Sequence, residues 1–136
     1  MLLYIKKRRG IIVNIRYCKH CGRICYTYPK SSKLICCGEE MEFLDPKTYE
    51  EGNEKHLPVV VKINENEINV KVGSVTHPML ENHFIQWIFV ENGENYQIKT
   101  FKPGEKPEAN FYVDFSKPVK VYEFCNLHGL WMTELK

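Results

Sequence analysis

Residues 119–129 of this chain read VKVYEFCNLHG, and this stretch decides the fold class. Between Val119 and Phe124, neighbouring side chains would lie on opposite faces of an extended chain, as in a β-strand. Cys125 comes where this strand should end, and His128 follows three positions later. Thiolate and imidazole are both ligands of transition metals, so we expect a metal site at this strand end. Taken alone, a C-x-x-H pair could equally belong to a zinc site.

Other short runs rich in β-branched and aromatic residues precede this strand. Polar turn segments containing Asn, Gly, Pro or Ser separate them, and no stretch shows a helical period. This pattern predicts an all-β domain, an antiparallel sandwich of immunoglobulin-like type. The predicted strands are residues 57–63, 67–72, 84–90, 96–101, 109–115 and 119–124.

Three further histidines lie where this sandwich could gather ligands. His56 and His83 come directly before predicted strands, and His77 precedes Pro78, which disfavours helix and indicates a loop. A lone histidine is more often a structural residue than a ligand. Strand ends and loops can nevertheless meet at one rim, and four imidazoles with one thiolate suit a five-coordinate metal better than a closed tetrahedral zinc site.

The other cysteines are concentrated before residue 40. Cys18 and Cys21 form a C-x-x-C knuckle followed by glycine, whereas Cys36 and Cys37 are adjacent, which is unusual because neighbouring side chains of extended chain point in opposite directions. These four predict a tetrahedral thiolate site, and spacing alone favours zinc and iron equally. We expect Cys25 to be a bystander.

This separation of ligand types predicts two domains. A polar stretch, residues 45–53, is typical of a linker between them. We divide the chain into an amino-terminal extension of unknown role (1–16), a small metal-binding domain (17–45), a linker with an active-site loop (46–55) and the sandwich (56–136).

Composition narrows the class of protein. The chain has 136 residues, 43% of them hydrophobic and 26% charged, as expected of a packed globular protein. A net charge of +2 with dispersed basic residues does not indicate nucleic-acid binding. The apolar run after Arg9 is too short for a signal peptide or a membrane span, so we expect a cytoplasmic protein that does not bind membranes.

The ordered motifs resemble those of desulfoferrodoxin, the two-iron superoxide reductase family, across residues 17–136. The matching segments are residues 18–22, 36–41, 54–58, 72–79, 83–88 and 125–131. The first sixteen residues and Cys25 depart from the family pattern.

The resemblance implies two iron ions per chain. It implies a rubredoxin-like or desulforedoxin-like Fe(Cys)4 centre held by Cys18, Cys21, Cys36 and Cys37. It further implies a square-pyramidal catalytic iron with equatorial His56, His77, His83 and His128 and an axial Cys125. In that pattern His128 binds through Nδ1 and the other histidines through Nε2.

The implied activity is one-electron reduction of superoxide to hydrogen peroxide without dioxygen production. Lys55 would attract the anion and orient a proton-donating water, and Glu54 would close the sixth position of the oxidised iron. An external electron donor such as rubredoxin and a homodimer are also implied. The alternatives are an iron electron-transfer protein without turnover and a zinc-stabilised binding module.

Overall fold

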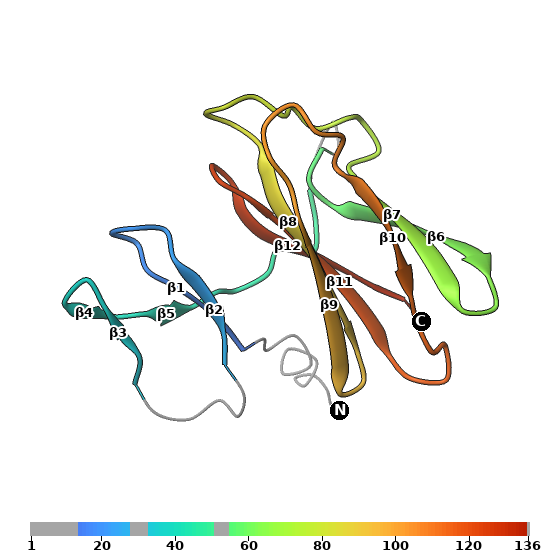
Figure 1. The fold of residues 1–136 in the computed structure, drawn as a ribbon, viewed down its shortest axis with the longest axis horizontal. Coiled ribbons are helices and arrows are strands. Elements are labelled where there is room, and N and C mark those ends of the chain that lie inside the picture. Colours follow the sequence, from blue (N-terminus) through green and yellow to red (C-terminus); the bar gives the residue numbers. More distant parts are fainter. Residues whose placement is uncertain (1–13, 28–32, 51–54, 136) are drawn as a thin grey trace. The chain divides into compact units, whose positions relative to one another are not determined.

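The computed structural model describes residues 14–27, 33–50 and 55–135, and these contain strands and no helix (Figure 1). The all-β prediction is therefore confirmed. The chain forms two compact units, Met1–Pro46 and Lys47–Lys136. The described part contains no helix that could cross a membrane.

The amino-terminal unit has two small sheets. Its first strand begins at Ile15, so the last residues of the predicted extension belong to a strand, and residues 1–13 lie outside the described part. One sheet has the antiparallel order β2-β1-β5, and β3 pairs with β4 in a separate hairpin. The strands are β1 (Ile15–Tyr17), β2 (Ile24–Tyr26), β3 (Ile35–Cys36), β4 (Glu39–Glu40) and β5 (Glu42–Phe43).

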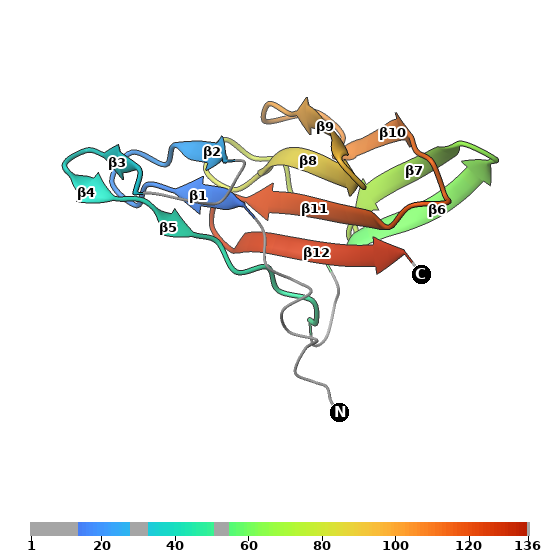
Figure 2. The same ribbon diagram turned by 90° about the horizontal axis from the view of Figure 1, so that it is seen from below.

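The second unit consists of two antiparallel sheets, shown from two directions in Figures 1 and 2. One has the order β10-β7-β6 and the other β12-β11-β8-β9. The strands are β6 (Pro58–Asn64), β7 (Glu67–Val72), β8 (Ile85–Asn92), β9 (Asn95–Thr100), β10 (Glu108–Tyr112), β11 (Val119–Cys125) and β12 (Gly129–Leu135).

The core of this unit consists of side chains from both sheets. On β7 the buried residues are Ile68, Val70 and Val72, two positions apart, as expected for a strand with one buried face. They belong to the same cluster as Val119 and Val121 of β11 and several residues of β8. The predicted sandwich is thus confirmed. Apolar side chains fill its interior, so the candidate ligands lie at the strand ends.

One strand of the sandwich was not predicted. β12 begins at Gly129 and continues through Leu130, Trp131 and Met132, which are all buried, so it lacks the alternation that identified the other strands. It pairs with β11 along its whole length, from Cys125 opposite Gly129 to Val119 opposite Leu135. This hairpin places the C-x-x-H segment in the turn between two strands.

Candidate metal centres

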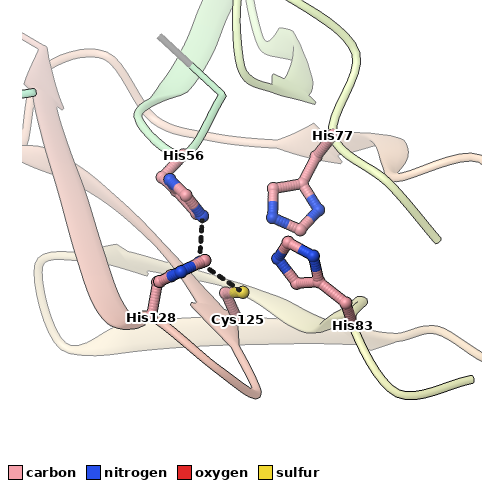
Figure 3. A group of neighbouring side chains, drawn as sticks. All are labelled: His56, His77, His83, Cys125 and His128. Carbon is pink, nitrogen blue, oxygen red and sulfur yellow. Dashed lines mark hydrogen bonds between the residues drawn. The ribbon is translucent and has the colours of Figure 1, made fainter. Parts of the chain in front are cut away.

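The five side chains predicted at the sandwich rim come together (Figure 3). Their candidate ligand atoms all lie within 4.8 Å of one another, and the residues are His56, His77, His83, Cys125 and His128. Strand pairing explains this convergence, because Pro58 at the start of β6 is opposite Val72 at the end of β7, and Ile85 at the start of β8 is opposite Cys125. The loops at this end of the sandwich therefore all approach one point.

Cys125 is held at an irregularity of the sheet. The register between β11 and β8 shifts between Phe124 and Cys125, and the Cys125 side chain is fully buried. Such irregularities re-aim a side chain relative to the regular pleat. The next residue, Asn126, links the loops that carry the ligands. Its side chain accepts a hydrogen bond from Phe84 N (2.9 Å) and donates one to Asn82 O (3.1 Å). Asn126 thus ties the Cys125–His128 turn to the segment that carries His83.

The connection from β7 to β8 depends on Gly73. This glycine has φ +84°, and a Cβ there would lie 2.5 Å from Lys55 O and 2.6 Å from Val75 O. Only glycine allows the two backbone segments to approach so closely at this positive φ. The segments on either side of the contact lead to His56 and His77, so Gly73 sets how near these two ligands lie.

Hydrogen bonds define which ring nitrogens face the centre. His77 Nδ1 lies 2.7 Å from Pro78 O, a group that can only accept, so Nδ1 carries the proton and Nε2 presents a lone pair. His56 Nε2 lies 3.0 Å from His128 Nδ1, which is itself 3.7 Å from Cys125 Sγ. These are the ring atoms that the family resemblance implies as ligands.

The donor set suits a bound transition metal. Among the described residues, His77 Nε2 and His83 Nε2 are buried without a hydrogen-bond partner, which is costly unless another group completes them. Imidazole and thiolate donors match iron, copper or zinc better than the oxygen-seeking magnesium or calcium. A metal ion at the point where the five donors meet would satisfy both orphaned nitrogens.

Burial shifts the pKa values of the candidate ligands. It lowers the pKa of His77 to about 4, assisted by the neighbouring histidines, and it also lowers the pKa values of His83 and His128. These three imidazoles are therefore in the neutral, ligating form at pH 7. Burial raises the pKa of the Cys125 thiol, so this group keeps its proton until a metal replaces it.

The two other predicted site residues precede His56. Glu54 lies outside the described residues. Lys55 is half-buried, and its charge contributes, after burial and the charge of His56, to the lowered pKa of His83. The Lys55 ammonium therefore acts electrostatically on the centre.

Sequence reasoning missed one group beside this centre. Glu50 lies in the predicted linker, yet its carboxylate accepts hydrogen bonds from both His56 N (3.0 Å) and His56 Nδ1 (2.6 Å). The ring of Trp131 also stacks on His56. Glu50 occupies no recognisable motif, and only the general preference of metal-bound histidines for a carboxylate partner could have suggested it.

The amino-terminal unit brings its four predicted cysteines together as well. The Sγ atoms of Cys18, Cys21, Cys36 and Cys37 lie within 4.8 Å of one another, and all are free thiols. The adjacent pair is possible because Cys37 has φ +54°, a left-handed conformation that is rare outside glycine. This backbone turn lets both neighbouring thiols reach one point. Cys25 lies on β2 and is not part of the group.

The four thiols are electrostatically coupled. Backbone hydrogen bonding from Arg23, with help from the neighbouring thiols, lowers the pKa of Cys21 to about 7. The pKa of Cys37 is raised to about 12, and its hydrogen bond with Cys21 contributes most to this shift. The pKa of Cys18 is also lowered, mainly by backbone hydrogen bonding from Cys21, whereas that of Cys36 is raised, so the four thiols differ in how readily they lose a proton to a bound metal. A tetrahedral thiolate set of this kind accepts zinc or iron.

Exposed charged side chains link the two cysteine-containing segments of this second centre. His20 hydrogen bonds to Glu39, and Lys19 lies 3.4 Å from another oxygen of the same carboxylate. The His20 side chain is exposed. These contacts link the C-x-x-C knuckle to the residues after Cys37, although exposed ion pairs of this kind stabilise a fold only slightly.

The fold and the donor sets define a class: a β-sandwich metalloprotein with one five-donor histidine and cysteine centre, preceded by a unit with a tetrathiolate centre. Residues 48–134 match the family model described as desulfoferrodoxin. The chain belongs to the desulfoferrodoxin family.

Individual relatives agree with this assignment. The chain is 48% identical over 119 residues to a desulfoferrodoxin from Syntrophotalea carbinolica, covering 86% of this chain and 92% of the relative. Its structure is similar to the crystal structure of the superoxide reductase from Treponema pallidum, with a TM-score of 0.70, 31% identity, and 89% and 96% of the two chains covered. A superoxide reductase (1Fe-SOR) from Giardia intestinalis matches 61% of this chain with 98% of its own, at 28% identity and a TM-score of 0.54.

Proposed function

We infer that this protein is a superoxide reductase, which reduces superoxide to hydrogen peroxide at an Fe(His)4Cys centre in its second unit. The observation that carries this conclusion is the convergence of four imidazoles and one thiolate within 4.8 Å. Family membership supports it, and relatives from Treponema pallidum and Giardia intestinalis bear the name superoxide reductase.

The protein contains two iron centres. His56, His77, His83, Cys125 and His128 hold the catalytic iron, and Cys18, Cys21, Cys36 and Cys37 hold the other. When bound, the catalytic iron supplies the single electron that reduces superoxide. The reaction consumes one electron and two protons for each superoxide, so an external reductant must restore the ferrous state and no dioxygen is formed.

The chain's own residues contribute charge and protons. The Lys55 ammonium, beside the first histidine, raises the local concentration of the anionic substrate. It also orients a water that delivers a proton to the reduced oxygen species. With iron bound, the Cys125 thiolate would donate electron density to the metal and so favour electron transfer to the substrate. We assign to Glu54 the role of a further ligand of the oxidised centre, because a hard carboxylate would suit ferric iron.

The wider cellular role is also part of this proposal. Electron balance calls for an external donor, and a small iron protein such as rubredoxin would serve. The family resemblance implies a homodimer, and we include this state in the proposal. All six cysteines are free, which supports residence in the reducing cytoplasm.

Metal analysis combined with visible spectroscopy tests the proposal first. Protein purified under iron-replete conditions should contain two iron ions per chain, and oxidation should produce the intense charge-transfer colour of cysteinate on ferric iron. A colourless, zinc-loaded protein would favour a zinc-stabilised module instead.

A second measurement separates an enzyme from an electron carrier. Reduced protein is mixed with a pulse of superoxide, and oxidation of the second-unit iron is followed together with the yield of hydrogen peroxide. We expect rapid oxidation and one peroxide per iron oxidised. Slow oxidation without stoichiometric peroxide would identify an electron-transfer protein.

A further inference from the structure

We propose that Lys47, Glu50 and Trp131 are positioning residues that fix the tautomer of His56 and the orientation of both His56 and His128 before any metal binds. The inference rests on the proposed metal centre but concerns a different part of the chain. Lys47 and Glu50 lie in a stretch whose sequence is typical of a linker. In the structure this stretch is hydrogen bonded to the turn and strand that follow Cys125.

Glu50 determines which nitrogen of His56 is available. One carboxylate oxygen accepts a hydrogen bond from the His56 backbone N–H (3.0 Å) and the other from Nδ1 (2.6 Å), and both side chains are largely buried, at 13% and 10% exposure. A carboxylate oxygen this close to a ring nitrogen accepts its hydrogen, so Nδ1 carries the proton and Nε2 keeps its lone pair. That lone pair faces the centre.

Lys47 and Trp131 together hold the backbone of His128. The His128 carbonyl accepts hydrogen bonds from Lys47 Nζ (2.8 Å) and from Trp131 Nε1 (3.1 Å). The Lys47 ammonium also lies 4.8 Å from the centre of the Trp131 ring, within the range of a cation–π interaction. The backbone of Lys47 donates to Leu130 O and accepts from Met132 N, both at 2.9 Å, so this residue is paired with β12. The turn containing His128 therefore cannot move independently of Lys47.

Trp131 connects the two histidines. Its ring lies parallel to that of His56, with centroids 4.8 Å apart and planes 12° from parallel, while its Nε1 bonds to the His128 carbonyl. The two ligand atoms, His56 Nε2 and His128 Nδ1, end up 3.0 Å apart. His77 differs, since its Nδ1 bonds to the adjacent Pro78 O and needs no distant residue. The residues around Lys47 and Glu50 thus orient half of the imidazole set from outside the binding motifs.

The test for Glu50 uses the metal-free full-length protein. Long-range proton–nitrogen NMR spectra report the tautomer of each imidazole, and in the parent His56 should be protonated at Nδ1. In Glu50→Gln the amide can donate to Nδ1, so we expect a shift toward the tautomer protonated at Nε2. Cobalt(II) affinity of the histidine site should fall about 10- to 100-fold, as is typical when the partner of a metal-bound histidine is removed. Glu65→Gln, in an exposed turn, is the matched control and should change neither quantity.

Two further variants test the hydrogen bonds to His128. Lys47→Met keeps an unbranched stem beside the tryptophan but removes the ammonium donor, and Trp131→Phe keeps an aromatic ring next to His56 but removes Nε1. We expect each to weaken cobalt(II) binding several-fold and to shift the cysteinate charge-transfer band of the iron-loaded protein. The effect of the double variant should differ from the product of the two single effects, because both donors share one carbonyl.

The outcomes distinguish this proposal from the proposed function. An unchanged His56 tautomer in Glu50→Gln, with cobalt(II) affinity within twofold of the parent, would overturn the role of Glu50. Unchanged affinity and unchanged band position in both Lys47→Met and Trp131→Phe would overturn the role of the other pair. A parent protein that binds iron yet does not reduce superoxide would remove the proposed function and leave the positioning roles standing. If Glu50→Gln does not fold, Glu50→Ala, which removes the acceptor, gives the readout: a mixture of His56 tautomers would support the role of Glu50, and an unchanged tautomer protonated at Nδ1 would overturn it.

Discussion

Lys55 is the residue to which we assign the electrostatic attraction of the substrate to the histidine centre. It precedes His56, is half-buried, and affects the pKa of His83 through its charge. A positive group next to a site for a small anion speeds association, and the benefit falls as salt screens it.

Replacing this charge should slow capture of superoxide. In Lys55→Ala we expect the second-order rate constant to fall about tenfold at low ionic strength, with a weaker salt dependence than the parent. Lys55→Arg should retain most of the rate, and Lys71→Ala, an exposed lysine on β7, is the control. Pulse radiolysis measures all four proteins, and a rate in Lys55→Ala equal to that of the parent would contradict the role.

His77 makes the metal-free protein sensitive to acid. Burial lowers its pKa from 6.5 to about 4, so between these values the unfolded chain binds a proton that the folded chain does not. Stability therefore rises with pH through this window and is lost as pH falls from about 6.5 to about 4. Urea unfolding of the metal-free protein at several pH values should show this slope. His77→Gln should flatten it, and an equally steep slope in that variant would assign the effect to other groups.

At the scale of elements, the connection between β7 and β8 is the part that most constrains the site. It supplies His77 and His83, and it closes on itself through paired backbone hydrogen bonds between Leu80 and His83 of 2.9 and 3.1 Å. Its first residue, Gly73, contacts the backbone of Lys55. The element therefore positions ligands from two different parts of the chain.

Adding one methyl group at Gly73 should disturb both ligands. Gly73→Ala places a Cβ 2.5 Å from Lys55 O at φ +84°, and we expect a loss of about 2–3 kcal/mol in the free energy of unfolding together with weaker metal binding. Gly104→Ala is a matched control, because φ there is +90° and a Cβ would meet nothing within 4 Å. It should cost about 1 kcal/mol and leave metal binding unchanged. Equal effects in the two variants would show that strain alone, and not the contact, matters.

Strands with a clear alternation were predicted with the most accurate bounds. The strand over residues 67–72 was found with its observed bounds because polar and apolar residues alternate along it. β12 was missed because its buried residues do not alternate and form a continuous run that is shorter than the one in β8. The site shows the same limit, since ligands occur in recognisable motifs whereas Glu50 acts through a contact that only folding creates.

At the scale of the whole molecule, the chain carries two centres in two compact units. Each unit contains all the candidate ligands of its own centre. Within the described residues of the first unit few apolar side chains are buried, and Ile15 and Met41 are among those almost fully buried. A bound metal is expected to provide much of the stability of so small a unit.

Removing one thiolate should therefore separate the two centres. In Cys21→Ser we expect the metal content to fall from two ions to one per chain, with loss of the tetrathiolate absorption and increased proteolysis of the first unit. The charge-transfer band of the histidine centre should remain. Metal analysis and limited proteolysis measure these effects, and a variant that loses both metals would show that the centres depend on each other.

The burial of the ligands also determines how many protons leave when each metal enters. At pH 7 His77, His83 and His128 are already neutral, so the buried Cys125 thiol is the principal source of a released proton at the histidine centre. The tetrathiolate centre differs, because Cys36 has a raised pKa and that of Cys37 is about 12, so several thiols must give up protons there. Metal occupancy of the first unit should consequently fall off more steeply with acid than that of the second. The two metals of one chain would then release different numbers of protons on binding, and mild acid should remove the metal from the tetrathiolate centre first.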